Sequence, residues 1–207
     1  MFWFYHLCFI LASVVFRLPY RIRVIGRENL PRDRGYVLCP NHLSAIDPVF
    51  VVLARGFGKP MWVMAKEELF RNGFVAWFFR HVGVFPVERG KGDKTVLNNA
   101  IESVRNGRSM LIFPEGTRNK KGEGLLPLKS GAFVVAESAH ADIVPCRVLY
   151  KGGRQHLFCT VTVVFGAPIP IDSLNLGGEH AASKLRAAKA VLAARLGELY
   201  EQNKQYE

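Results

Sequence analysis

The residues best suited to chemistry in this sequence are His42 and Asp47, which lie five positions apart in the stretch NHLSAID. If this stretch begins a helix, the carboxylate lies a little over one turn beyond the imidazole and can hydrogen-bond to one ring nitrogen. Such a carboxylate fixes the tautomer and stabilises the imidazolium that forms when the other nitrogen takes a proton. The pair therefore predicts a general base with an orienting partner. The alternative is that Asp47 only caps a helix that starts with Pro48.

Three more stretches place polar side chains after apolar, strand-like runs. GVFPVER ends in Arg89, whose guanidinium suits an anionic ligand, although a single arginine in a loop often has no ligand. LIFPEGTRN brings Glu115, Thr117 and Arg118 together at a turn that can grip a hydroxylated, phosphorylated ligand. The alternative there is a charged turn with an internal Glu115–Arg118 pair. We interpret the fourth stretch, IVPCR at 143–147, as a structural strand.

Several other kinds of site are excluded by inspection. The sequence has no G-x-S-x-G nucleophile elbow and no G-x-x-x-x-G-K-[ST] phosphate loop, and no G-x-G-x-x-G follows the first predicted strand. No second cluster of ligands could complete a metal site with His42 and Asp47, so we expect no metal. The four cysteines lack paired or zinc-type spacing, which predicts buried free thiols in a reducing compartment.

Strand-like and helix-like runs alternate along most of the chain, which predicts an α/β domain with a central, mostly parallel sheet flanked by helices. We expect strands at 22–25, 36–39, 61–64, 82–87, 109–113, 143–149 and 159–165. We expect helices at 48–55, 67–80, 93–105, 131–140 and 179–202. Each polar stretch follows a predicted strand, which is where α/β proteins place their sites. No internal repeat or long linker divides this domain, which we place at 21–207.

The composition indicates a globular chain with an anionic partner. Of the 207 residues, 49% are hydrophobic and 22% are charged, which excludes a disordered protein. Lys and Arg number 28 against 17 Asp and Glu, and the resulting net charge of +11 favours nucleic acid, anionic lipid or a phosphorylated small molecule. The mean hydropathy of +0.10 favours lipid among these. The basic residues are scattered and no nucleic-acid motif appears, so we expect no nucleic-acid partner.

Residues 2–16 form an apolar run in which only His6 and Ser13 are polar. The run has 15 residues, fewer than the ~20 that span a bilayer, and the positive charge follows it, unlike in a signal peptide. Its leading aromatics and the arginines after it predict a helix within 1–20 that attaches to an anionic membrane surface without spanning it. The arginines would hold the domain on the cytoplasmic face of the cell membrane. The alternative is a core helix docked on the domain.

The four stretches, in this order, resemble the blocks of the 1-acyl-sn-glycerol-3-phosphate (lysophosphatidic acid) acyltransferase family. The family's H-x-x-x-x-D block matches NHLSAID, its G-x-F-x-x-x-R-type block matches GVFPVER, its FPEGTR block is present letter for letter, and its V-P block matches Val144-Pro145. MAKEELF at 64–70 and LKSGAF at 128–133 also look like the family. The resemblance implies the glycerolipid acyltransferase fold, a central sheet flanked by helices.

The resemblance also implies an activity, which is transfer of an acyl group from acyl-CoA or acyl-carrier protein to the sn-2 hydroxyl of lysophosphatidate, giving phosphatidate. It implies that His42 removes the proton from the hydroxyl while Asp47 holds His42, and that no metal or organic cofactor is needed. It implies that Lys66 and Arg89 bind the acceptor's phosphate. The residues that would line the acceptor site are Glu115, Gly116, Thr117 and Arg118.

Other functions stay open at this point. The acceptor could be another lysophospholipid or a lyso-aminolipid, which the Lys66 and Arg89 cations disfavour. Water as the acceptor would make the protein a thioester hydrolase. A non-catalytic module that binds membranes through its basic N-terminus is disfavoured by the intact His42 and Asp47.

Overall fold

The computed structural model describes residues 3–87, 94–122 and 124–207, and within them the core is a seven-stranded sheet. The strands run in the order β1-β7-β6-β2-β5-β3-β4. Every neighbouring pair is parallel except β6 and β7, so the predicted mostly parallel sheet is confirmed. The strands are β1 (Arg21–Ile25), β2 (Val37–Pro40), β3 (Trp62–Lys66), β4 (Val84–Val87), β5 (Met110–Leu111), β6 (Ile143–Tyr150) and β7 (Thr160–Phe165).

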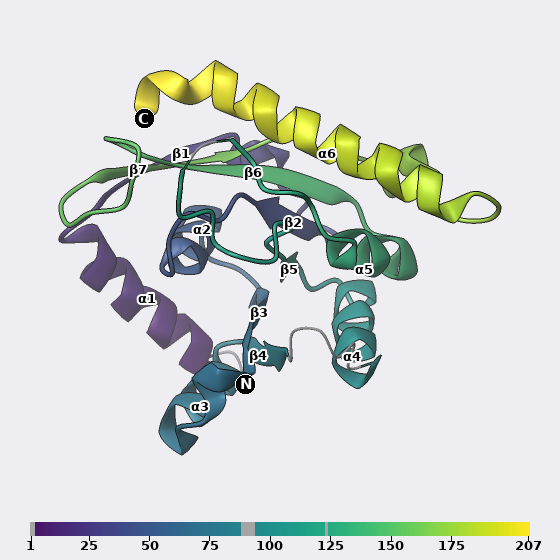
Figure 1. Ribbon diagram of the computed structural model, residues 1–207. Coiled ribbons are helices and arrows are strands. Elements are labelled where there is room, and N and C mark those ends of the chain that lie inside the picture. The colour runs from purple at the N-terminus through teal and green to yellow at the C-terminus, as the bar shows by residue number, and fades with distance from the viewer. Residues whose placement is uncertain (1–2, 88–93, 123) are drawn as a thin grey trace.

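Helices cover both faces of this sheet, and Figure 1 shows α6 and α2 on opposite sides of β6 and β7. Side chains from α4, α5 and α6 share one apolar core with the sheet, and side chains from α2 share the other. Alternate residues of β2 divide between the two cores, as expected for a strand covered on both faces. The helices are α1 (Trp3–Arg17), α2 (Asp47–Arg55), α3 (Gly73–His81), α4 (Lys94–Arg105), α5 (Gly131–Ala139) and α6 (Ala181–Asn203).

Two elements differ from the sequence-based expectation. The strand expected at 109–113 is only two residues long, because Pro114 has no N–H to donate and the chain turns directly after it. The helix expected at 67–80 is divided into a 3-10 turn, Glu67–Phe70, and α3. The break lies at Asn72, whose side chain accepts hydrogen bonds from the backbone N–H groups of Phe74 (3.0 Å) and Val75 (3.2 Å) and so caps α3.

All four cysteines are free thiols, as predicted. Cys39 in β2, Cys146 in β6 and Cys159 directly before β7 are buried, whereas Cys8 on α1 is partly exposed. Burial raises the pKa of Cys39 and of Cys146 well above the usual range for a thiol. These two thiols therefore stay protonated and behave as small apolar side chains.

Helix α1 docks against the domain along one side and leaves apolar side chains exposed along the other. On the docked side, the His6 ring bonds to the carbonyl of Gly58 (3.2 Å), and the rings of Phe16 and Phe50 lie 5.9 Å apart. Helix α3 likewise exposes Phe74 and Trp77. No helix among the described residues is both long enough and apolar enough to cross a membrane. The exposed apolar residues at and just after α1 are Trp3, Leu7, Ile10, Leu11, Val14, Val15 and Leu18.

Candidate active site

His42 and Asp47 form the hydrogen-bonded pair that their spacing predicts. His42 lies two residues beyond β2, and Asp47 is the first residue of α2. The Nδ1 atom of His42 lies 2.9 Å from Oδ2 of Asp47. With the carboxylate as acceptor, Nδ1 holds the proton and Nε2 keeps a free lone pair, which is the tautomer that a general base requires.

The Asp47 carboxylate is fully buried and collects donors from the turn that precedes α2. Its Oδ2 atom accepts from the backbone N–H groups of Leu43 and Ser44, each at 2.7 Å, in addition to the imidazole. The N-cap residue of α2 is Ile46, which makes no side-chain capping bond. The Asp47 side chain therefore holds the turn against His42. It does not cap α2, as the alternative interpretation of this stretch would require.

The remaining oxygen of Asp47 is held by Tyr150, a residue that the sequence did not single out. Tyr150 is the last residue of β6, its side chain is completely buried, and its hydroxyl donates to Oδ1 of Asp47. Burial, and then the charge of Asp47, raise the pKa of Tyr150 far above its usual value. The hydroxyl therefore keeps its proton and acts as a permanent donor to the carboxylate.

A second buried carboxylate, Glu115, holds the backbone of His42. Its Oε1 atom accepts from the N–H of His42 (2.8 Å), and its Oε2 atom accepts from the N–H of Leu126 (2.9 Å). The backbone N–H of Asn119 donates to the carbonyl of His42 at 2.7 Å. Glu115 therefore ties the FPEGTR turn to the backbone of His42, and its predicted place in the acceptor site stays a prediction.

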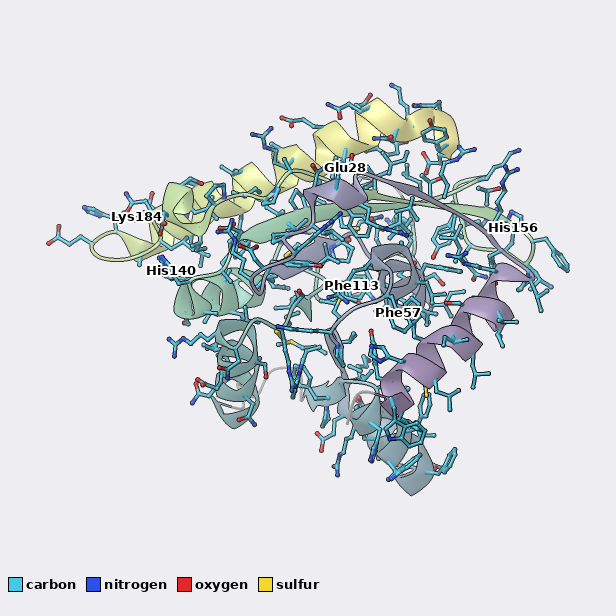
Figure 2. All side chains as sticks on the ribbon, turned by 180° about the vertical axis from the view of Figure 1, so that it is seen from behind. Glu28, Phe57, Phe113, His140, His156 and Lys184 are labelled. Carbon is cyan, nitrogen blue, oxygen red and sulfur yellow. The ribbon has the colours of Figure 1, made fainter. Side chains whose placement is uncertain are left out.

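The His42 ring itself is held in place by a neighbouring aromatic side chain. Its imidazole stacks on Phe113, with ring centroids 3.9 Å apart, and the labelled Phe113 lies in the middle of the molecule in Figure 2. The preceding residue, Asn41, is buried. The oxygen of its side-chain amide accepts from the N–H of Val148 (2.7 Å), and the nitrogen donates to the carbonyl of Val148 (3.1 Å). Ring stacking and these hydrogen bonds leave the imidazole preorganised for proton transfer.

Of the other residues proposed from the sequence, those that the structure describes lie at or just beyond the C-terminal ends of neighbouring strands. Lys66 is exposed at the end of β3, and β5 lies between β3 and β2 in the sheet. Thr117 and Arg118 are exposed in the turn after β5, where Gly116 has a left-handed backbone with φ 68°. Arg89, the second proposed phosphate ligand, lies outside the described residues.

The fourth stretch of the sequence forms part of the buried strand β6, as its structural interpretation predicts. Within it, the Arg147 guanidinium packs over the ring of Tyr200, 4.8 Å from the centroid. Burial lowers the pKa of Arg147, and the charge of Glu115 opposes that shift. Among the residues that the structure describes, no three His, Cys, Asp or Glu side chains are grouped so that they could hold a metal ion.

Comparison with known proteins points to one kind of enzyme. Residues 21–149 match the family described as Acyltransferase. The chain is 29% identical over 207 aligned positions to a Bacillus subtilis protein named 1-acyl-sn-glycerol-3-phosphate acyltransferase, covering 94% of this chain and 96% of that protein. A Streptococcus pneumoniae protein of the same name is 32% identical, with 70% of this chain and 53% of the relative aligned. This chain thus spans nearly all of the first relative and about half of the second.

A solved structure has the same fold. The structure of the 1-acyl-sn-glycerophosphate (LPA) acyltransferase PlsC from Thermotoga maritima superposes with a TM-score of 0.70, covering 94% of this chain and 79% of that one. The two sequences are 22% identical over this match. The arrangement of sheet and helices described above is therefore found in a second, distant protein.

The hydrogen bond from Tyr150 to Asp47 predicts a specific kinetic effect of the Tyr150→Phe substitution. A hydrogen bond to a charged group contributes about 1.5–3 kcal/mol, so we expect kcat to fall roughly 10- to 150-fold while KM changes little. The loss falls on kcat because Asp47, released from this donor, no longer holds the imidazole in its productive orientation.

Tyr36→Phe is the matched control, because Tyr36 is equally buried but its hydroxyl accepts from Arg55 (3.1 Å). It should leave kcat and KM unchanged. If Tyr36→Phe lowers kcat as much as Tyr150→Phe does, the role of Tyr150 is packing alone.

Proposed function

Because this chain belongs to the Acyltransferase family, we propose that it transfers a fatty acyl group from acyl-CoA or acyl-carrier protein to the sn-2 hydroxyl of 1-acyl-glycerol-3-phosphate. The product is phosphatidate, the precursor of other glycerophospholipids. The names of the Bacillus and Streptococcus relatives support this choice of acceptor. The observation that supports acyl transfer most directly is the His42 imidazole, bound through Nδ1 to a buried carboxylate.

In the proposed reaction, Nε2 of His42 takes the proton of the acceptor hydroxyl as that oxygen attacks the carbonyl carbon of the thioester. A carbon–oxygen bond forms, the carbon–sulfur bond breaks, and the thiolate leaves with the bonding electron pair. The imidazolium then returns its proton to the thiolate. Asp47 stays ionised throughout and stabilises the imidazolium. A thioester is already activated, so no acyl-enzyme intermediate is needed.

The acceptor's phosphate is the group that the cations at this edge of the sheet would recognise. A phosphomonoester carries nearly two negative charges at neutral pH and pairs well with Lys and Arg side chains. We assign its binding to Lys66 and Arg89, with Gly116, Thr117 and Arg118 lining the rest of the acceptor site. Lys66 and Arg118 are exposed, as ligands for an incoming anion must be.

The acceptor is itself a lipid, so we propose that α1 holds the enzyme on the cytoplasmic face of the cell membrane. The exposed apolar side of α1 would lie within the headgroup region of one leaflet. Arg17 and Arg21, which follow at the end of the helix, are exposed and could meet lipid phosphates. Arg23 also follows, and its guanidinium stacks over the ring of Tyr206, 4.4 Å from the centroid.

The proposed function predicts that the purified protein converts lysophosphatidate and an acyl thioester to phosphatidate, which mass spectrometry of the products would detect. His42→Ala should lose on the order of 10²–10⁴ in rate, because it removes the general base. His140→Asn is the control, since His140 is exposed beyond α5 and asparagine tolerates its left-handed backbone (φ 52°).

A folded His42→Ala variant with near-normal turnover would contradict this mechanism. Thioester cleavage without any acceptor would instead identify a hydrolase. Equal turnover with acceptors that lack a phosphomonoester would point to another lysophospholipid or a lyso-aminolipid.

The proposed phosphate ligands predict a selective loss of acceptor binding. Lys66→Ala and Arg89→Ala should each raise the KM for lysophosphatidate much more than the KM for the acyl donor. Arg89→Lys should restore only part of the loss, because a point charge lacks the paired donors of a guanidinium. Arg186→Ala, which removes an exposed cation on α6, should change neither constant. Equal effects on both substrates would assign the substituted residue a structural role.

Membrane attachment through α1 predicts salt-dependent binding to vesicles. Each arginine near an anionic surface adds ~1 kcal/mol, so replacing both Arg17 and Arg21 by Gln should weaken binding roughly 10- to 30-fold at low salt. The difference should shrink at high salt, where surface charges are screened. Sedimentation with phosphatidylglycerol-containing vesicles at low and high salt measures the binding of the wild type and of the variant. Unchanged binding would favour the alternative in which α1 is only a docked helix.

A further inference from the structure

The hairpin that joins β6 to β7 presents two large apolar side chains that the fold itself does not use. Leu157 and Phe158, which we call the tip, lie in the connecting loop shortly before β7, with exposed fractions of 59% and 75%. The next residue, Cys159, is buried, so the core of the domain ends directly below the tip. Exposing two adjacent bulky apolar side chains to water is energetically unfavourable. Exposed apolar patches can mark an interaction surface.

The backbone of the tip is fixed in an unfavourable conformation. Phe158 has φ 65°, a left-handed value that is rare for a bulky residue and costs free energy. The surrounding hairpin is tied down, since the Gln155 side chain donates to the hydroxyl of Tyr20 (2.8 Å) and Gly152 N–H donates to the carbonyl of Glu207 (3.2 Å). The exposed Phe158 side chain thus projects from a loop whose backbone is held by hydrogen bonds to the rest of the domain.

The charged side chains of the hairpin itself are basic. Lys151 and Arg154 are exposed, no acidic residue occurs between positions 151 and 160, and Glu207 contacts the hairpin at Gly152. Exposed apolar side chains that lie close to cations in the sequence form the pattern of a segment that inserts into an anionic headgroup layer. This charge complementarity favours lipid over an acidic protein, which would bind the cations without filling an apolar tip.

The hairpin also lies on the same side of the molecule as α1. Figure 1 shows the turn between β6 and β7 beside the C-terminal end of α1, and Figure 2 shows the labelled His156 in the same place from behind. The hairpin begins directly after Tyr150, whose hydroxyl bonds to Asp47. The tip therefore projects from the edge of the sheet that holds His42.

We propose that the β6–β7 tip is a second membrane-contact site, which inserts Leu157 and Phe158 into the headgroup region of an anionic leaflet. The inference rests on the proposed function, because a lipid acceptor is what brings this edge of the sheet to a membrane. Contact at two points, α1 and the tip, fixes the orientation of the domain on the bilayer. The edge with His42 then faces the surface from which a lipid acceptor enters.

Vesicle binding by a Leu157→Ser/Phe158→Asn double variant tests the proposal, with asparagine chosen because it tolerates the left-handed backbone. On vesicles of equal parts phosphatidylcholine and phosphatidylglycerol, we expect binding to weaken about tenfold or more, since two apolar side chains lose their burial. Val191→Ser is the matched control, because Val191 is an exposed apolar residue on α6. Binding of the double variant equal to that of wild type would overturn the proposal.

A second measurement reports on the tip directly and does not depend on that variant folding. Phe158→Trp should be quenched by lipids brominated along their acyl chains, beyond any quenching of the native tryptophans in the unsubstituted protein. No added quenching would overturn the inference.

Activity separates this proposal from the proposed function. The double variant should turn over a short-chain, water-soluble lysophosphatidate at the wild-type rate and lose activity only on vesicle-borne acceptor. If the wild type acylates no acceptor while the tip still inserts, the proposed function fails and the membrane contact stands. If the double variant is equally active on both forms of acceptor, the tip does not bring the active site to the membrane.

Discussion

The site is organised around a charge that has no contact with water. The Asp47 carboxylate is fully buried, and both of its oxygens are hydrogen-bonded, to the His42 ring, two backbone N–H groups and the Tyr150 hydroxyl. These donors come from the turn after β2 and from the end of β6, so both strands must be in register for the carboxylate to be satisfied. The same bonds that stabilise the charge fix the direction of the imidazole, so folding and the preparation of the catalytic base depend on one interaction.

Local features of the site could be predicted from the sequence, and long-range features could not. The spacing of His42 and Asp47 is enough to bring them together, because both belong to a single turn. Tyr150 is 103 positions from Asp47, and no local pattern distinguishes it from any other tyrosine at a strand end. The two backbone hydrogen bonds of Glu115 are also long-range, because they reach His42 and Leu126 from the FPEGTR turn, and the sequence does not predict them.

The same distinction holds for the fold. The alternation of strand-like and helix-like runs predicted the α/β class and the location of most elements, because apolar residues recur with different periods in a strand and in an amphipathic helix. The direction of β7 depends on its partner β6, and the short length of β5 depends on the turn that follows it. The division of 67–80 depends on one side chain, that of Asn72, which accepts hydrogen bonds from two backbone N–H groups.

The distribution of the cysteines provides a spectroscopic opportunity. Three of the four thiols are buried, and the fourth, Cys8 on α1, is partly exposed. A thiol-reactive dye applied to the folded protein would therefore attach mainly to the helix proposed to meet the membrane, without substitution of any native cysteine. Its emission would report the polarity around α1, while the catalytic edge of the sheet remained unmodified.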